Sequence, residues 1–161
     1  MTRRTAFDIR PMTDRAALEE LLRLRWSDGS IFVRGRLITP PDVEAFGAYH
    51  DNKLQGVATW RIEDGSLYLL TMNNITDRRG VGEALLVRML GLARERKLPH
   101  LRVIISNDNV GAFRFYQKRG FRIVAVHVGV VDMMRKMKPS IPEIGSEGIR
   151  MRDEIELEIA L

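Results

Sequence analysis

The stretch Asn73–Leu86, NNITDRRGVGEALL, lies between two hydrophobic patterns of different period. The apolar run Leu67–Met72 before it predicts a strand. After it, apolar residues recur at the spacing of one helix face, at Leu85, Leu86, Met89, Leu92 and Ala93. The two glycines of Arg78–Gly82 (RRGVG) let the backbone approach a ligand closely, and the first N–H groups of the helix point outward with the positive end of its dipole. The stretch therefore predicts a turn that binds a phosphate or a pyrophosphate.

Two common phosphate-binding motifs do not fit this turn. Glu83, Ala84 and Leu85 follow the second glycine, so the third glycine of the dinucleotide-binding fingerprint is missing. No Gly-Lys-Ser/Thr follows, which excludes a P-loop. A lone Gly-x-Gly is also typical of an ordinary strand-to-helix turn whose glycines only make room for packing. A second segment downstream favours the anion-binding interpretation.

The second segment is Asn107–Phe121, NDNVGAFRFYQKRGF, which follows the apolar run Leu101–Ile105. The run predicts a strand, and the segment predicts a helix. Asn107 or Asp108 is expected to cap this helix, and Gly120 is expected to end it in the left-handed conformation.

Together the two segments resemble the GNAT family of acyl-coenzyme A-dependent N-acetyltransferases. The shared pattern is a strand, an Arg-x-Gly-x-Gly/Ala turn, a helix, a strand, and then Asn-x-x-Ala-x-x-x-Tyr-x-x-x-Gly-Phe. It covers residues 67–128 in detail and the whole chain more loosely. The resemblance implies one α/β (α+β) domain over residues 1–161, with a mixed, mostly antiparallel central sheet and flanking helices. It also implies an enzyme that moves an acetyl group from acetyl-CoA to a primary amine by direct attack in a ternary complex. The acceptor is expected to be a small-molecule or a peptide amine, and the sequence does not identify it.

The resemblance assigns roles to individual residues. The pyrophosphate of coenzyme A is expected on the turn and the start of the helix, at Arg78, Arg79, Gly80, Val81, Gly82, Glu83 and Ala84. The strand end at Met72 would pair with the pantetheine arm and orient the acetyl carbonyl, and Asn109 would hydrogen-bond the pantetheine. Tyr116 is the expected catalytic residue, which protonates the leaving thiolate. Asp77 stands where the family's turn usually begins with Gln or Arg, and a carboxylate there weakens pyrophosphate binding unless it points away.

Simpler roles exist for some of these residues. Taken alone, Tyr116 is typical of a core tyrosine and Asn109 of a helix cap, and only their joint spacing with Gly120 and Phe121 favours function. The spacing singles out no general base. The candidates, besides a chain of water molecules, are His127, Asp132, Asp153 and Glu154.

Composition limits the other function classes. The formal net charge is +5, but the basic residues form no long run, so no nucleic-acid partner is expected. Solvated surface together with a site for a polyanion such as coenzyme A accounts for the excess. Two alternatives stay open, namely a non-catalytic acyl-CoA sensor or scaffold and a basic nucleic-acid-binding module. The chain has no cysteine and only three scattered histidines, so no metal site is expected. No membrane span or signal peptide is expected, which favours a cytoplasmic protein, and a homodimer is possible.

Upstream of the turn, the pattern predicts a strand at Phe7–Arg10 and then a helix capped by Thr13 or Asp14. Leu18, Leu21, Leu22 and Arg25 or Trp26 would share one face of that helix. Ser27–Pro41 is expected to be an irregular connection over the acceptor groove, with Arg34 and Arg36 as exposed charges. Trp26 and Trp60 are expected in the core. An antiparallel meander is predicted at Phe46–His50, Leu54–Ile62 and Ser66–Met72.

Downstream, a helix at Gly80–Arg96 would cross to Leu101–Ile105 as a right-handed parallel connection, and this parallel pair would separate at one end. A further strand is predicted at Phe121–Val128. The extension 129–152 follows and includes a short basic helix at Val131–Lys138. Glu154–Leu161 alternates glutamates with apolar residues, the period of a half-exposed strand, and is expected to pair antiparallel with Phe121–Val128 and complete the sheet.

Overall fold

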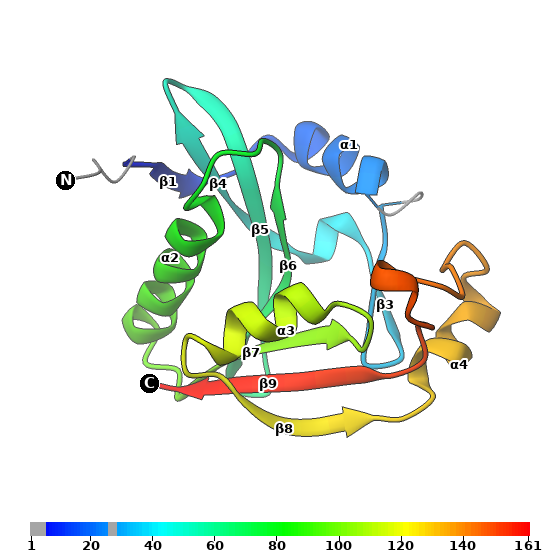
Figure 1. Ribbon diagram of the computed structural model, residues 1–161. Helices are drawn as coiled ribbons and strands as arrows, with labels where there is room; N and C mark the ends of the chain where they lie inside the picture. Colours follow the sequence, from blue (N-terminus) through cyan, green and yellow to red (C-terminus); the bar gives the residue numbers. More distant parts are fainter. Residues whose placement is uncertain (1–5, 26–28) are drawn as a thin grey trace.

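The computed structural model describes residues 6–25 and 29–161, and within them a single seven-stranded sheet forms the centre of the molecule (Figure 1). Its order is β1-β4-β5-β6-β7-β9-β8, and only β6 and β7 pair in parallel. The strands are β1 (Asp8–Pro11), β4 (Glu44–His50), β5 (Lys53–Glu63), β6 (Ser66–Asn74), β7 (His100–Ser106), β8 (Arg122–His127) and β9 (Glu154–Ala160). The mixed, mostly antiparallel sheet predicted from the sequence is confirmed.

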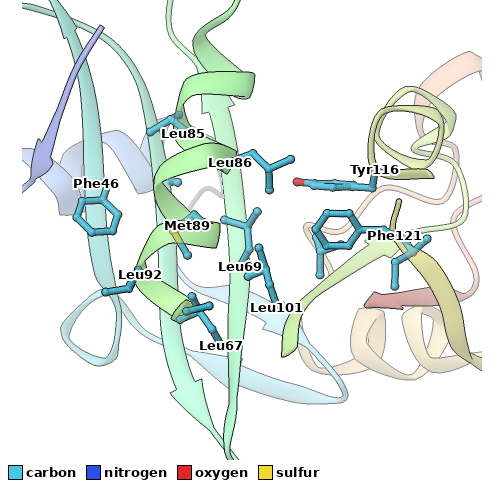
Figure 2. Packing of buried hydrophobic residues seen from close by; sticks show 14 of the residues in the cluster. Phe46, Leu67, Leu69, Leu85, Leu86, Met89, Leu92, Leu101, Tyr116 and Phe121 are labelled. Carbon is cyan, nitrogen blue, oxygen red and sulfur yellow. The ribbon is translucent and has the colours of Figure 1, made fainter. Parts of the chain in front are cut away.

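One face of the sheet is covered by α2 (Val81–Glu95) and α3 (Val110–Gln117). Leu67 and Leu69 alternate toward this face, and Leu85 and Met89 of α2 pack over them without exposure to solvent (Figure 2). Full burial of each such side chain contributes roughly 1.5–3 kcal/mol. The predicted apolar stripe of α2 is therefore the face that holds this helix, and the turn before it, on the sheet.

The opposite face is covered by α1 (Arg15–Arg25), whose Leu18 and Leu22 are fully buried. The carboxylate of Asp14 accepts a hydrogen bond from the N–H of Ala17 at 3.0 Å, so Asp14 is the cap of α1. Trp26, which the sequence also placed on this helix face, lies outside the described residues. Trp60, expected in the core, is partly buried and packs against the edge of the core, where it stacks on Phe46 with ring centroids 5.8 Å apart.

The prediction of an irregular connection at Ser27–Pro41 is wrong for most of the residues that the structure describes there. Its described part, 29–41, contains a hairpin of β2 (Ile31–Val33) and β3 (Arg36–Ile38), followed by a single turn of 3₁₀ helix at Pro40–Asp42. Arg34 and Gly35 have φ angles of 53° and 70°, which are the left-handed values that a tight two-residue hairpin turn requires. This signal was missed because a strand of three residues is too short to show a period.

The two arginines of the hairpin behave differently. Arg36 is exposed and pairs with Glu63, as expected for a surface charge. Arg34 is half-buried, and its guanidinium donates to the hydroxyl of Tyr68 at 2.9 Å, so its prediction as an exposed charge is wrong. The hairpin folds back onto the sheet and thereby carries Arg34 inward.

The last strand also differs from its prediction. β9 pairs antiparallel with β8 as expected, but it also pairs with β7, so it lies inside the sheet and β8 forms the edge. Glu154 and Glu156 are only 4% and 5% exposed, which contradicts a half-exposed strand. Arg34 and His127 cover these carboxylates and provide the partners that buried charges need.

The extension 129–152 contains α4 (Val130–Met137), in agreement with the predicted short helix, and a 3₁₀ turn at Ser146–Gly148. The structure brings α4 beside the β2–β3 hairpin (Figure 1), where a Cβ placed on Gly35 would lie 3.2 Å from Met133 Cε. Among the described residues, no helix combines the length and the apolar character needed to cross a membrane.

Candidate active site

The parallel strands β6 and β7 separate in the middle of the sheet. Their pairing runs only from Leu67 opposite Leu101 to Leu69 opposite Val103. At the same point the register between β5 and β6 shifts, because Thr59 lies opposite Thr71 and Trp60 lies opposite Leu69. The extra residue, Leu70, is a bulge, and a bulge bends its strand. The predicted separation of the parallel pair is thus confirmed, and past Leu69 one edge of β6 is not paired with β7.

A cavity of about 500 Å³ lies at this separation. Its walls come from the ends of β6 and β7, from α3, from β2, and from α4 with the segment after it. The predicted site residues Met72, Asn109 and Tyr116 all line it. The volume is within the range of ordinary small-molecule sites.

The predicted anion-binding turn lies next to this cavity but does not line it. The residues predicted to bind the pyrophosphate belong to this turn and to the start of α2, and they are Arg78, Arg79, Gly80, Val81, Gly82, Glu83 and Ala84. Met72 connects the two regions, because a Cβ on Gly82 would lie 3.5 Å from Met72 Cε. The structure therefore places the predicted binding residues along one continuous path.

The turn has the features of an anion site. Gly80 is in the left-handed conformation with a φ of 89°, and no side chain caps the first turn of α2. Arg78 and Arg79 are exposed, and neither forms an ion pair with another described residue. The carbonyl of Gln55 accepts the N–H groups of Ile75 at 2.8 Å and Thr76 at 3.4 Å, which holds the approach to the turn in place.

Asn109 caps α3, since its side-chain oxygen accepts the N–H of Ala112 at 3.1 Å. The cap is neither Asn107 nor Asp108, which corrects the prediction for those two residues. Because the cap uses the amide oxygen of Asn109, the amide nitrogen can donate to a ligand in the cavity. Asn109 can therefore serve both as a cap and as a binding residue.

Tyr116 lies on α3 and is 4% exposed. Its ring packs edge-on against Phe115 and Phe121, at centroid distances of 5.1 and 5.2 Å. Figure 2 shows the hydroxyl directed toward Leu86 of α2. Burial raises the pKa of the Tyr116 hydroxyl well above its usual value, because the ionised form loses its hydration. At neutral pH the hydroxyl therefore keeps its proton and can donate it.

The four candidate bases have different surroundings. Three of them interact with groups that do not line the cavity. His127 Nε2 lies 3.0 Å from the carboxylate of Glu156, and Asp132 pairs with Arg135 at 2.6 Å. Asp153 accepts the N–H of Gly129 at 2.8 Å. Glu154 is the one of the four that lines the cavity. Burial raises its pKa, although the N–H of Arg34, which donates to it at 3.0 Å, partly opposes the shift.

The role of Asn107 and Asp108 could not be found from the sequence. The side-chain oxygen of Asn107 accepts the N–H groups of Arg152 at 2.9 Å and Asp153 at 3.0 Å. Asp108 accepts the N–H of Ser146 at 2.8 Å. These residues fasten the extension 129–152 against the start of α3, beside Asn109. The nearest sequence signal was a cluster of Asn and Asp, which is equally typical of a cap.

Comparison with known proteins gives the family. A model described as an acetyltransferase (GNAT) domain matches residues 32–135, which is more than half of the chain. The chain therefore belongs to the GNAT family of acetyltransferases. The protein YxbD of Bacillus subtilis (strain 168) is 31% identical over 131 residues, which are 81% of this chain and 82% of YxbD.

Solved structures show the same fold. The structure of an IAA acetyltransferase from Bacillus cereus ATCC 14579 has a TM-score of 0.75 at 21% identity and covers 97% of this chain and 100% of its own. A Bacillus subtilis acetyltransferase, solved in complex with CoA, has a TM-score of 0.73 at 18% identity over 97% of this chain and 99% of its own.

Proposed function

We propose that this chain transfers an acetyl group from acetyl-CoA to a primary amine by direct attack in a ternary complex. The observation that carries the proposal is the path from an anion-binding turn, past the separation of β6 and β7, to a cavity lined by both Tyr116 and Glu154. A protein of the same fold has been solved with CoA bound, which supports the choice of ligand.

The residues along this path fit coenzyme A. The N–H groups at the start of α2 and the charges of Arg78 and Arg79 are suited to the pyrophosphate. The unpaired edge of β6 near Met72 offers backbone groups to the amides of the pantetheine arm, and Asn109 donates to it from α3. Acetyl-CoA, when bound there, supplies an activated acetyl group and a thiolate leaving group.

The side chains of the cavity divide the proton transfers between them. Glu154 takes a proton from the ammonium group of the acceptor, so that the neutral amine can attack the acetyl carbonyl. The backbone N–H near Met72 holds the carbonyl oxygen as negative charge develops. As the C–S bond of the tetrahedral intermediate breaks, Tyr116 gives its proton to the departing sulfur, and the second proton lost by the acetylated nitrogen returns to Tyr116 by way of solvent. We choose Glu154 as the base because it lines the cavity, whereas His127, Asp132 and Asp153 do not.

Binding of coenzyme A is expected to raise the thermal midpoint of the protein. At a concentration one hundred times the Kd, the ligand adds about 2.7 kcal/mol of stability. Gly80→Asp places a carboxylate in the turn and is expected to abolish the rise. Gly65→Asp is the matched control, because Gly65 also has a positive φ (70°) but lies in the β5–β6 turn with nothing within 4 Å of its Cβ position.

Asn109→Ala is expected to reduce the same rise. Loss of the cap by itself costs about 1 kcal/mol, so the quantity to compare is the ligand-induced shift of each variant rather than its absolute midpoint. A full shift in Gly80→Asp would contradict the placement of the pyrophosphate. No shift in the wild type would contradict coenzyme A as the ligand.

Asp77→Gln is expected to strengthen coenzyme A binding. Asp77 is exposed and directly precedes the two arginines of the turn, so its charge opposes the pyrophosphate. Because exposed charges interact weakly in water, we expect a tightening of Kd by roughly two- to fivefold, measured by calorimetry at low salt. Asp64→Asn, an exposed carboxylate of the β5–β6 turn, should leave the Kd unchanged. Weaker binding by Asp77→Gln would show that Asp77 supports the turn.

A cytoplasmic location and a homodimer stay predictions. Sedimentation of the purified protein measures the second directly.

A further inference from the structure

Apolar side chains of β2 and α4 line one part of the cavity, which we take as the acceptor side. They are Ile31 and Val33 of β2 and Val131 and Met134 of α4, and all four are at most 7% exposed. Ile141, from the segment after α4, continues the same wall. An apolar body of an acceptor would be removed from water against this wall, which favours its binding.

This wall is held firmly in place. The guanidinium of Arg135 donates to the carbonyls of Ile141 at 3.1 Å, Pro142 at 2.8 Å and Met151 at 2.8 Å, and all three of these residues line the cavity. Lys138 Nζ donates to the carbonyl of Ser30 at 3.0 Å and so joins the segment to the start of the hairpin. The hairpin and α4 also touch at Gly35 and Met133. The cavity is therefore bounded on this side and suits a compact molecule better than an extended peptide.

The charges around the cavity are unequal. Among the described residues that line it, Glu154 is the one acidic side chain, and Arg25 and Lys138 are the two basic side chains. One carboxylate can receive one ammonium group. A second ammonium on the same acceptor would find no second carboxylate among the described lining residues, and the two cations would repel it.

We propose that the acceptor is a compact primary monoamine with an apolar body, whose single ammonium group faces Glu154 and whose body packs against Ile141 and Met134. This inference rests on the proposed function, because it names the acceptor class of that same site. It distinguishes such amines from polyamines and from the N-termini of proteins.

The test compares pentylamine with cadaverine, which has the same chain length and a second terminal amine, and with a peptide that begins with alanine. Transfer from acetyl-CoA is followed by the appearance of free thiol. We expect kcat/KM for pentylamine to exceed that for cadaverine by at least about tenfold, because the described residues that line the cavity offer no carboxylate to the second charge.

A second carboxylate should change this preference. Ile141→Glu adds a carboxylate to the apolar wall. It is expected to lower the ratio of kcat/KM for pentylamine to kcat/KM for cadaverine by about tenfold or more. Ile141→Gln, which is polar but uncharged, should not favour the diamine. Ile144→Glu is the matched control, because Ile144 is 57% exposed on the same segment and does not line the cavity, so its ratio should stay that of the wild type.

Failure of the monoamine inference can be told apart from failure of the proposed acetyl-CoA-dependent activity. Equal or better use of cadaverine or of the peptide by the wild type overturns the monoamine inference, and so does an unchanged ratio in an Ile141→Glu variant that still responds to coenzyme A. If pentylamine is not acetylated at all, the inference fails as well. The coenzyme A-induced thermal shift, which needs no acceptor, then shows whether the proposed cofactor site still stands.

Discussion

Replacing Glu154 by glutamine is expected to lower kcat for amine acetylation by about 10²- to 10⁴-fold, the usual contribution of a positioned general base. Glutamine keeps the size of the side chain and can still accept the N–H of Arg34, but it cannot take a proton from the acceptor. The rate is measured with saturating acetyl-CoA and an excess of amine. The Kd of coenzyme A should be unchanged, because Glu154 is not among the residues that we propose to hold coenzyme A.

The pH dependence provides a second readout for Glu154. Only the carboxylate form can accept a proton, so the wild-type rate should rise with pH through the pKa of Glu154, which burial raises above its usual value. In Glu154→Gln this rise should disappear. Asp132→Asn is the control, because Asp132 pairs with Arg135 and Arg150 outside the cavity and should leave the pH profile unchanged.

As the pH rises, the stability of the folded protein should fall over the range in which its activity rises. Since the pKa of Glu154 is raised in the folded state, the folded protein binds more protons than the unfolded chain between the ordinary pKa of glutamate and the folded pKa. Stability therefore falls as the pH rises through that window. Glutamine carries no charge to bury, so the thermal midpoint of Glu154→Gln at neutral pH should be no lower than that of the wild type. A strongly destabilised variant would mean that Glu154 mainly supports the fold.

Tyr116→Phe is expected to lower kcat about a hundredfold or more, with little change in the Kd of coenzyme A. Only the hydroxyl oxygen is removed, and the ring contacts with Phe115 and Phe121 remain. Because the pKa of Tyr116 is raised, the proton stays on the hydroxyl across the neutral range, and deprotonation of this residue should not limit the wild-type rate there. Tyr49→Phe, on β4 and away from the cavity, is the matched control.

The chemistry of the thiol leaving group sharpens this test. A thioester with a more acidic thiol needs less protonation as it leaves, so it should restore part of the rate lost in Tyr116→Phe. Equal loss with both donors would place the effect of Tyr116 elsewhere. If the wild type binds coenzyme A tightly and acetylates no amine of any class, the alternative of a non-catalytic acyl-CoA sensor is favoured over the enzyme.

Strong local patterns made most of the fold predictable. The stripe from Leu85 to Ala93, the apolar runs before and after it, and the turn at Arg78–Gly82 each depend on neighbours a few residues apart. The structure places these elements within a few residues of their predicted bounds. Short elements were harder, because β2 and β3 have three residues each and show no period.

The candidate site was predicted unevenly. Met72, Asn109 and Tyr116 could be assigned because their spacing matches a family pattern, and the structure brings all three to one cavity. The base could not be assigned, because the sequence around Glu154 looks like an ordinary alternating strand. Its burial depends on Arg34, which is 120 positions away in the chain.

The sequence by itself determined the strand–turn–helix unit that we propose as the anion site, since backbone conformation and helix amphipathicity are local properties. Only the tertiary structure decided which carboxylate enters the cavity and what surrounds it. Insertion of β9 between β7 and β8 and the folding back of the β2–β3 hairpin bury Glu154 and bring Arg34 to it. These contacts join residues far apart in the chain, so no local pattern encodes them, and the pKa of Glu154 follows from burial that exists only after folding.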